Sequence, residues 1–331
     1  MEFRPIESSK VRSILENACD ANGLVGFKRF IEIALYDREI GYYRSDRPRI
    51  GRNPETDFFT ATSLKTAFAP IVLEAALGLA RSIPFPPEEL AWVEIGAEPE
   101  AQLFKNLENP FRSQTTLALG EILQIDEPAI VFSNELFDAQ PFASVVFRGN
   151  SWLERSIEVR DQGIRLVERA PTSEEVTERI ADLPNPAPEG YTIDLPTGAN
   201  ALLGKIAAQD WKGIFLAFDY GKTWHSLAFD TPQGTARAYR SHQQVGDLLE
   251  NIGQQDITCH ICWDWIIDGL ETGGFDSIEL ESQESFILQR APAFVKQAFE
   301  GDNDQMGALR QLIHPSMMGQ KFQALSAIRT A

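Results

Sequence analysis

The sequence is short of cysteine, of cationic side chains and of long apolar runs. It has only 3 cysteines in 331 residues, an odd number too small for a disulfide framework. Lysine and arginine total 30 against 48 aspartates and glutamates, which leaves a formal net charge of −18. Because so negative a surface repels polyanions, we expect neither nucleic acid nor an anionic membrane as a partner.

Membrane-spanning and targeting patterns are also lacking. The most apolar stretch, residues 67–80, is too short to cross a bilayer and contains Pro70 and Glu74. Residues 1–10 have neither the apolar core of a secretory signal nor an arginine-rich amphipathic pattern. These features predict a cytoplasmic protein, and the 43% of hydrophobic residues predicts a large folded core.

The chain divides into three predicted regions. Residues 1–87 carry apolar positions at helical spacing and end in a proline-rich linker, which predicts a helical N-terminal region. Residues 88–290 are predicted to form an α/β core, within which residues 143–190 are predicted as a β insertion. Alternating apolar residues and glycine turns make that insertion antiparallel. Residues 291–331 are predicted to be C-terminal helices.

Short apolar runs separated by helical stretches define the predicted core. Such alternation is typical of a mostly parallel sheet flanked by helices. A helix is expected from Pro99 to about Leu107, because proline and acidic residues favour a helix start. The predicted strands lie at residues 91–96, 117–119, 129–132 and 214–218.

Six short motifs occur along the chain in a fixed order. They are FIEIALYDREIGYY at 30–43, DFFT at 57–60, VFSNELFDA at 131–139, FDYG at 218–221, GTARAY at 234–239 and DITCH at 256–260. Together they resemble the MidA (DUF185) family of S-adenosyl-L-methionine (SAM)-dependent methyltransferases, which is related to the mitochondrial complex I assembly arginine methyltransferase. The resemblance runs from about residue 27 to residue 290 and implies a class I, Rossmann-like methyltransferase fold.

The resemblance also implies roles for individual residues. The expected activity is methyl transfer from SAM to a protein nitrogen, arginine above all. The cofactor is expected to contact the turn after the first core strand, the DFFT segment and an acid near a second strand. These residues are Glu94, Gly96, Ala97, Asp57, Thr60 and Glu121.

The acceptor is expected to face Asn134, Glu135 and Asp138, just past a strand. If a helix begins there, Glu135 and Asp138 share one face and could hold a guanidinium in paired hydrogen bonds. The structural alternative is that Asn134 caps this helix and the two acids favour its positive end. Asp219 and His260 are further candidates, each with a structural alternative.

The turn after the first strand departs from the family pattern E-x-G-x-G-x-G. Glu98 and Glu100 replace its second and third glycines, and Pro99 between them removes a backbone donor. A non-glycine residue forced into left-handed geometry costs about 1–2 kcal/mol. Two such residues would weaken SAM binding by roughly 30- to 1,000-fold, at about 1.4 kcal/mol per tenfold. We therefore expect a degraded cofactor loop.

Two more departures lie near the expected cofactor site. Only 37 residues lie between Gly96 and Asn134, too few for the family's full helix and second strand, and Glu121 is not clearly at a strand end. Phe68-Ala69-Pro70 replaces the family's F-G-E. A non-catalytic scaffold that keeps the fold and binds a partner protein would explain these changes nearly as well, and a pocket remodelled for another ligand is a third alternative.

The cysteine pair at Cys259 and Cys262 does not predict a metal site. Cys259 and Cys262 are three residues apart on a predicted strand and so face opposite sides, and no second pair accompanies them. A protein substrate or partner protein is expected, and a homodimer is compatible with the sequence.

Overall fold

The computed structural model describes residues 2–45, 49, 60–97, 102–118, 124–125, 128–301 and 303–330. The chain divides into two units, each assembled from three segments. Unit 1 comprises Met1–Phe58, Phe137–Ala201 and Lys222–Asp264, and unit 2 comprises Phe59–Leu136, Leu202–Gly221 and Trp265–Ala331. The consecutive division at residues 87 and 290 stays a prediction.

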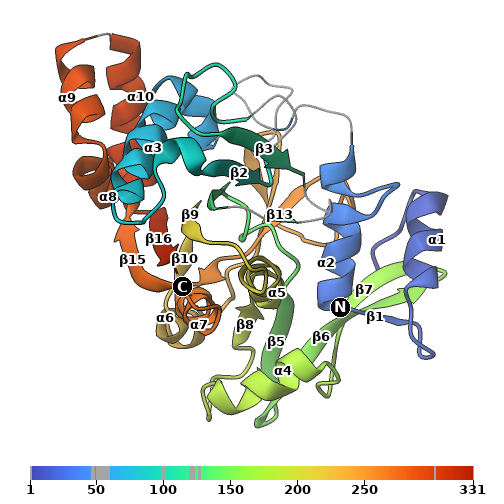
Figure 1. Ribbon diagram of the computed structural model, residues 1–331. Coiled ribbons are helices and arrows are strands. Elements are labelled where there is room, and N and C mark those ends of the chain that lie inside the picture. The colour runs from blue at the N-terminus through green and yellow to red at the C-terminus, as the bar shows by residue number, and fades with distance from the viewer. Residues whose placement is uncertain are drawn as a thin grey trace. The chain divides into compact units, whose positions relative to one another are not determined.

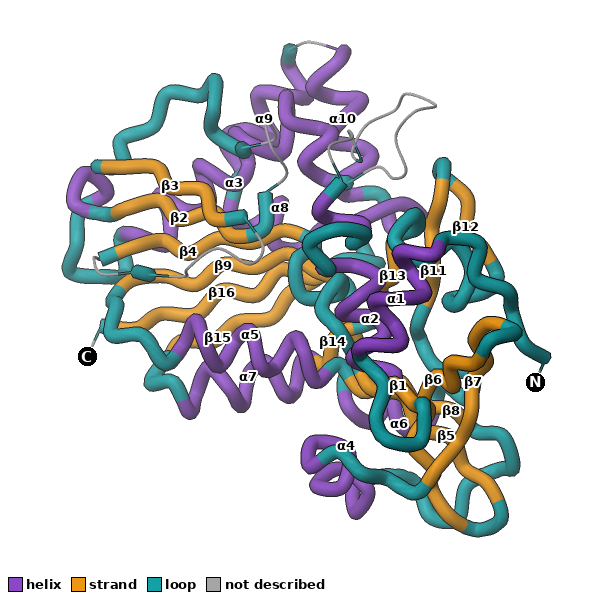
Figure 2. Tube along the Cα trace, turned by 90° about the vertical axis from the view of Figure 1, so that its right-hand side faces the viewer, coloured by secondary structure: helices purple, strands orange, loops and turns teal. Residues whose placement is uncertain are grey.

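A six-stranded sheet organises unit 2 (Figure 2). The four strands on one side, β3, β2, β4 and β9, pair in parallel, and β16 and β15 complete the sheet in antiparallel fashion. β2 and β9 are buried along their whole length, as expected for strands covered on both faces. In sheet order the strands are β3 (Ser113–Leu117), β2 (Ala91–Ile95), β4 (Ala129–Asn134), β9 (Gly213–Asp219), β16 (Gln323–Arg329) and β15 (Asp276–Ser282).

Strand β16 corrects the prediction of C-terminal helices. Helices α9 (Pro292–Glu300) and α10 (Asn303–Ile313) form as expected, but Gln323–Arg329 is a strand between β9 and β15. Its alanines and leucine are good helix formers, but intrinsic propensity is a weak guide, and burial between two strands outweighs it.

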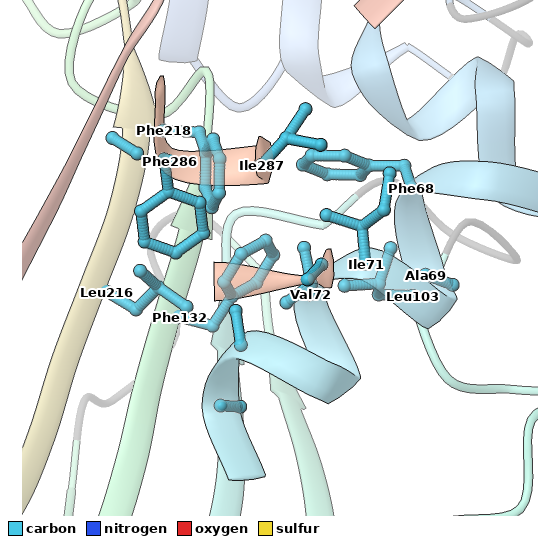
Figure 3. Packing of buried hydrophobic residues seen from close by; sticks show 14 of the residues in the cluster. Phe68, Ala69, Ile71, Val72, Leu103, Phe132, Leu216, Phe218, Phe286 and Ile287 are labelled. Carbon is cyan, nitrogen blue, oxygen red and sulfur yellow. The ribbon is translucent and has the colours of Figure 1, made fainter. Parts of the chain in front are cut away.

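One face of this sheet is covered by helices that share its largest apolar cluster. α3 (Lys65–Ala80), α8 (Gln283–Arg290), α9 and α10 pack there (Figure 1). Figure 3 shows side chains of α3 and α8 in this cluster. The ring of Phe68 on α3 meets Phe218 edge-on at 5.2 Å, and Phe218 meets Phe286 of α8 at 5.1 Å. These contacts fix α3 beside the carboxyl end of β9.

Helix α3 continues a 3-10 turn, η2 (Ala61–Leu64), into one long apolar segment. Among the described residues, Ala61–Ala80 is long and apolar enough to cross a membrane by length and composition, with a mean hydropathy of 1.4. This is longer than the apolar run seen in the sequence. Since 56% of that window is buried inside the protein, it equally fits a core helix, and the absence of a membrane partner stays a prediction.

A second, five-stranded sheet lies in unit 1 and confirms the antiparallel insertion. β6 pairs antiparallel with β1, β5 and β7, and β5 pairs antiparallel with β8. Its strands are β1 (Leu24–Gly26), β5 (Ala143–Arg148), β6 (Ser151–Arg160), β7 (Gly163–Arg169) and β8 (Thr192–Leu195). A smaller sheet joins β12 (Gln243–Val245), β11 (Arg237–Arg240) and β13 (Asp256–Thr258).

Helices α1 (Ser9–Asn17) and α2 (Phe27–Tyr36) lie in the N-terminal region, where the apolar spacing predicted helical structure. Ser8 caps α1 by accepting the Val11 N–H. Shorter helices are η1 (Tyr42–Arg44), η3 (Pro87–Glu89), α4 (Glu174–Arg179), η4 (Ile180–Asp182), α6 (Trp224–Phe229) and η5 (Pro315–Gly319). Three elements contain a boundary between the units: α5 (Thr197–Ala207), β10 (Gly221–Lys222) and α7 (Trp263–Thr272). Strand β14 (Ile261–Cys262) precedes α7.

Two local predictions differ from the structure. The described part of the helix predicted to Leu107, residues 102–107, forms turns instead. The second strand lies at Ser113–Leu117 rather than 117–119, and its partly polar residues hid it from a search for apolar runs.

Candidate active site

The first strand-end turn of unit 2 is built around Gly96. β2 ends at Ile95, and the Gly96 N–H donates to the Leu117 carbonyl at 2.8 Å. Gly96 has a φ of +81°, and a Cβ added there would lie 2.6 Å from Leu136 Cδ1. The left-handed backbone therefore favours glycine, and an added side chain would have to displace the end of Leu136. Ala97, which follows, is partly exposed.

Glu94 points into the interior of unit 2, with only 4% of its surface exposed. Its Oε2 accepts the Leu103 N–H at 2.9 Å. Burial raises the pKa of Glu94 from 4.5 to about 7, and the Leu103 hydrogen bond and the Lys65 charge only partly oppose the rise. The Glu94 carboxylate thus contacts the segment at Leu103, which follows the turn at Gly96.

Glu135 follows β4 in a strained conformation. Its φ is 51°, which a non-glycine residue adopts only at a cost, and its N–H donates to the Phe218 carbonyl at 2.8 Å. Because this conformation ends the strand without starting a helix, the predicted helix at this point is wrong. So is its alternative, in which Asn134 caps the helix, since Asn134 is the last residue of β4.

The Glu135 carboxylate gathers other predicted site residues. Its Oε1 accepts the Asn134 Nδ2 at 3.0 Å and the Ala61 N–H at 3.3 Å. Thr60, next to Ala61, forms a reciprocal capping box with Ser63 at the start of η2. The structure therefore brings Thr60, Asn134 and Glu135 to one corner of unit 2, where Thr60 also has a structural role.

Buried oxygen atoms at the end of β4 favour a polar ligand. Ser133 Oγ and Asn134 Oδ1 are buried and have no hydrogen-bond partner in the described part of the chain. Ser133 pairs with Ile95 across the parallel β2–β4 ladder, so it lies beside the turn at Gly96. Buried polar groups are normally satisfied, and a ligand with hydrogen-bond donors would satisfy these two. A SAM-like molecule, with an ammonium and hydroxyls, fits that requirement.

Asp219 confirms its predicted place at the end of β9. It is fully buried, and its Oδ1 accepts the Tyr220 N–H at 2.9 Å. A role in turn formation is thus present, and a ligand role stays a prediction.

Asp138 belongs to unit 1, where it lies in a cluster of acids and tyrosines. This aspartate–tyrosine cluster consists of Tyr36, Tyr43, Asp138, Tyr239 and Asp256. Tyr43 donates to Asp256 Oδ1 at 2.8 Å, and the Tyr36 and Tyr43 rings stack at 5.4 Å. Burial raises the pKa of Tyr36 and Tyr43 well above the usual range, and the nearby Asp256 and Asp138 charges raise it further. Asp138 and Asp256 are themselves buried.

Four of the six sequence motifs meet in this cluster. Its residues come from FIEIALYDREIGYY, VFSNELFDA, GTARAY and DITCH. The sequence did not identify the tyrosines or Asp256 as site residues, because no spacing rule joins positions more than a hundred residues apart. Their place in shared motifs was the only available signal.

His260 lies in the same unit. Its N–H donates to Thr235 Oγ1 at 3.2 Å. Burial lowers the pKa of His260 to about 4, and the Lys222 and Arg237 charges add to the fall, so its ring is neutral at pH 7. Among the described residues, no group of three or more His, Cys, Asp or Glu side chains is arranged to hold a metal.

Several predicted residues lie outside the described part of the chain. They are Asp57, Glu98, Pro99, Glu100 and Glu121. Ala69 and Pro70, from the departure in the F-G-E motif, are described and line a cavity of about 320 Å³ together with Lys65, Gln102 and Lys105.

A family model matches residues 85–279, more than half of the chain. The family is described as "Putative S-adenosyl-L-methionine-dependent methyltransferase". The chain belongs to this family. The resemblance inferred from the six motifs is thereby confirmed at family level, and the family's cofactor is the one the sequence indicated. No curated protein matches the sequence well enough to count as a relative.

Two solved structures share the fold. One is a COG1565 superfamily member from Burkholderia thailandensis bound to S-adenosyl-homocysteine, with 22% identity, a TM-score of 0.85, and coverage of 97% of this chain and 91% of that one. The other is a native COG1565 superfamily protein from the same organism, with 21% identity, a TM-score of 0.81 and the same coverage. At these identities the likeness establishes the mixed α/β fold alone.

Proposed function

We propose that this protein is a SAM-dependent methyltransferase that acts on a protein nitrogen, with an arginine guanidinium as the acceptor. The proposal rests chiefly on the strand ends of unit 2. Gly96 and Glu135, both with positive φ, follow neighbouring parallel strands in a chain that belongs to a methyltransferase family. In open α/β sheets, ligands bind at the carboxyl ends of the strands, and backbone strain concentrates at functional sites.

The described residues of the proposed donor side belong to unit 2. When bound, SAM supplies an electrophilic methyl group on its sulfonium. Glu94, Gly96 and Ala97 would border it, and Ser133 Oγ and Asn134 Oδ1 would accept hydrogen bonds from its ammonium or hydroxyl groups. Asp57, Thr60 and Glu121 are kept as proposed cofactor residues from the family pattern.

We expect the affinity for SAM to be lowered by the degraded loop. Glu98 and Glu100 replace glycines, so the sequence adds two carboxylates and side-chain bulk to a loop that is glycine-rich in the family pattern. A dissociation constant in the tens of micromolar or above would reflect such a loss, because a micromolar ligand is worth about 8 kcal/mol and each tenfold loss costs about 1.4 kcal/mol.

The acceptor side is proposed to involve Asn134, Glu135 and Asp138, as the family pattern implies. In unit 1, Asp138 lies with Asp256 among tyrosines, and two carboxylates can hold a guanidinium through charge-assisted hydrogen bonds. Such bonds would orient one nitrogen as the nucleophile, and a carboxylate would take the proton that the nitrogen loses on methylation.

Calorimetric titration with SAM and with S-adenosyl-homocysteine tests the donor side. We expect saturable binding of both, lost or weakened at least tenfold in Asn134→Ala. Asp161→Ala, which alters an exposed turn, is the control. Absence of heat at 1 mM of either ligand, with a folded protein, would contradict the proposal and favour a scaffold that binds a partner protein.

Tritium transfer from labelled SAM tests the acceptor. The substrate would be a lysate from cells lacking this protein, followed by acid hydrolysis and separation of methylated amino acids. Label in methylarginine supports the proposal, whereas label only in methyllysine would exclude arginine. We propose a cytoplasmic setting and a protein substrate, with neither nucleic acid nor membrane required.

A further inference from the structure

Asp194, on β8 in unit 1, is a buried carboxylate with an unusually complete set of partners. It is 4% exposed and lies directly across the β5–β8 ladder from Ser144. Its Oδ1 accepts the Ser144 hydroxyl at 2.7 Å, and its Oδ2 accepts the N–H groups of Thr235 and Ala236, each at 2.9 Å. Hydrogen bonds to a charged acceptor are among the stronger ones in proteins.

The turn that receives this carboxylate is shaped for it. Gly234 has a φ of +66°, and a Cβ added there would lie 2.2 Å from Asp194 Oδ2. Glycine thus lets the carboxylate reach two successive N–H groups, an arrangement that binds anions. The same glycine and threonine begin the GTARAY motif, although the sequence gave no role to Asp194.

From this turn, a continuous set of contacts leads to the aspartate–tyrosine cluster. Thr235 Oγ1 accepts the His260 N–H and lies 3.4 Å from Cys259 Sγ. The Cys259 N–H donates to the Asp138 carbonyl at 2.9 Å. The residues after the turn form β11, in which Tyr239 pairs with Asp256 of β13.

We propose that Asp194 is a positioning residue: by holding the turn at Gly234, Thr235 and Ala236, it sets the placement of Asp138, Tyr239 and Asp256. It acts through Thr235 and the β11–β13 pairing. The consequence for catalysis rests on the proposed function, in which this cluster serves the acceptor. The positioning itself does not depend on that function.

Asp194→Ala and Asp194→Asn test the positioning of the cluster separately from its effect on catalysis. Asparagine can still accept both N–H groups through its carbonyl oxygen, and its amide can donate to Ser144, whereas alanine can do neither. We expect Asp194→Ala to speed hydrogen exchange at least tenfold in residues 235–240 and 256–260. The acceptor KM should rise or kcat fall at least fivefold, with S-adenosyl-homocysteine affinity within twofold of wild type. Asp194→Asn should restore most of each loss.

A second pair of variants keeps the test decisive if Asp194→Ala fails to fold. Thr235→Val removes the hydroxyl that accepts the His260 N–H, and Thr235→Ser keeps it. We expect faster exchange in residues 256–260 for valine and recovery for serine, with Asp161→Ala unchanged. Unaltered exchange and unaltered acceptor kinetics in folded Asp194→Ala or Thr235→Val would overturn the proposal. Altered exchange without any wild-type methyl transfer would instead refute only the proposed function.

Discussion

Glu94, a buried residue near the end of β2, makes the stability of the protein depend on pH. The unfolded chain releases the Glu94 proton near pH 4.5, while the folded protein holds it up to about pH 7. Between these values the folded state binds more protons, so this group's contribution to stability falls as the pH rises. The shift in the pKa corresponds to a loss of at most about 3 kcal/mol in the free energy of unfolding. This loss is complete above pH 7.

Glu94→Gln should therefore remove a pH dependence. Glutamine keeps an oxygen acceptor for the Leu103 N–H but carries no charge. Urea unfolding at pH 4.5 and pH 8 should show variant and wild type nearly equal at the lower pH. At pH 8 the variant should be more stable by about 1–3 kcal/mol. Equal differences at both pH values would show that Glu94 is not held neutral in the fold.

Glu135 is the residue at which backbone strain and side-chain contacts can be separated. Its left-handed backbone costs about 1–2 kcal/mol in any residue except glycine. Its carboxylate meanwhile accepts two hydrogen bonds, each worth about 0.5–1.5 kcal/mol.

Glu135→Gly loses the hydrogen bonds but also the strain, whereas Glu135→Ala loses only the hydrogen bonds. We expect Glu135→Ala to be less stable than Glu135→Gly by about 1 kcal/mol in urea unfolding. Both variants should lose methyl transfer. A more stable alanine variant would mean that position 135 does not hold a left-handed conformation.

At the residue scale the sequence predicted the positions of site residues better than their backbone conformations. It placed Asn134 and Glu135 at a strand end, which the structure confirms, but it expected a helix where Glu135 adopts a positive φ. Nothing in the letters N-E-x-x-D states that φ, because the Phe218 and Ala61 contacts that hold it come from distant parts of unit 2.

Among the elements, the parallel strands β2 and β4 create the candidate site, and the turn at Gly96 fits closely against the chain that follows β4. The contact with Leu136 is with the end of a flexible side chain, so a small residue could be accommodated only with movement. Position 96 should nevertheless tolerate little change, because its left-handed backbone strains any residue other than glycine.

Gly96→Ala should destabilise the protein by about 1–3 kcal/mol, from the left-handed backbone and the shift of Leu136. SAM affinity should fall at least tenfold with it. Gly78→Ala is the matched control in the same unit, since Gly78 is exposed in α3 and nothing lies near its added Cβ. That variant should be stabilised by about 0.5–1 kcal/mol. Chemical denaturation and calorimetry check both, and an unaffected Gly96→Ala would remove the case for a tight turn.

Elements with strong periodicity were predicted well, and those decided by neighbours were not. α1 and α2 follow from apolar spacing, and α3, β2 and β9 from apolar runs. β3 is polar, and β16 is composed of residues that suit a helix, so each depends on the strands beside it.

For the whole molecule, the charge of −18 makes a prediction that is independent of the active site. At 0.1 M NaCl the protein should pass through a heparin column without retention and should bind a quaternary-amine column. Like charges repel, and screening at this ionic strength acts only beyond about 10 Å. Retention on heparin would reveal a local basic surface that the net charge conceals and would reopen nucleic acid as a partner.

The sequence by itself determined the family, the α/β class and the antiparallel insertion, because ordered motifs and apolar periodicity are local properties of the chain. Only the tertiary structure decided which residues meet. Each unit is assembled from three separated segments, so the hydrogen bond of Tyr43 with Asp256, or of Asp194 with Thr235, follows from the packing of distant segments rather than from sequence spacing. Buried polar contacts of this kind depend on three-dimensional complementarity, which no local pattern encodes.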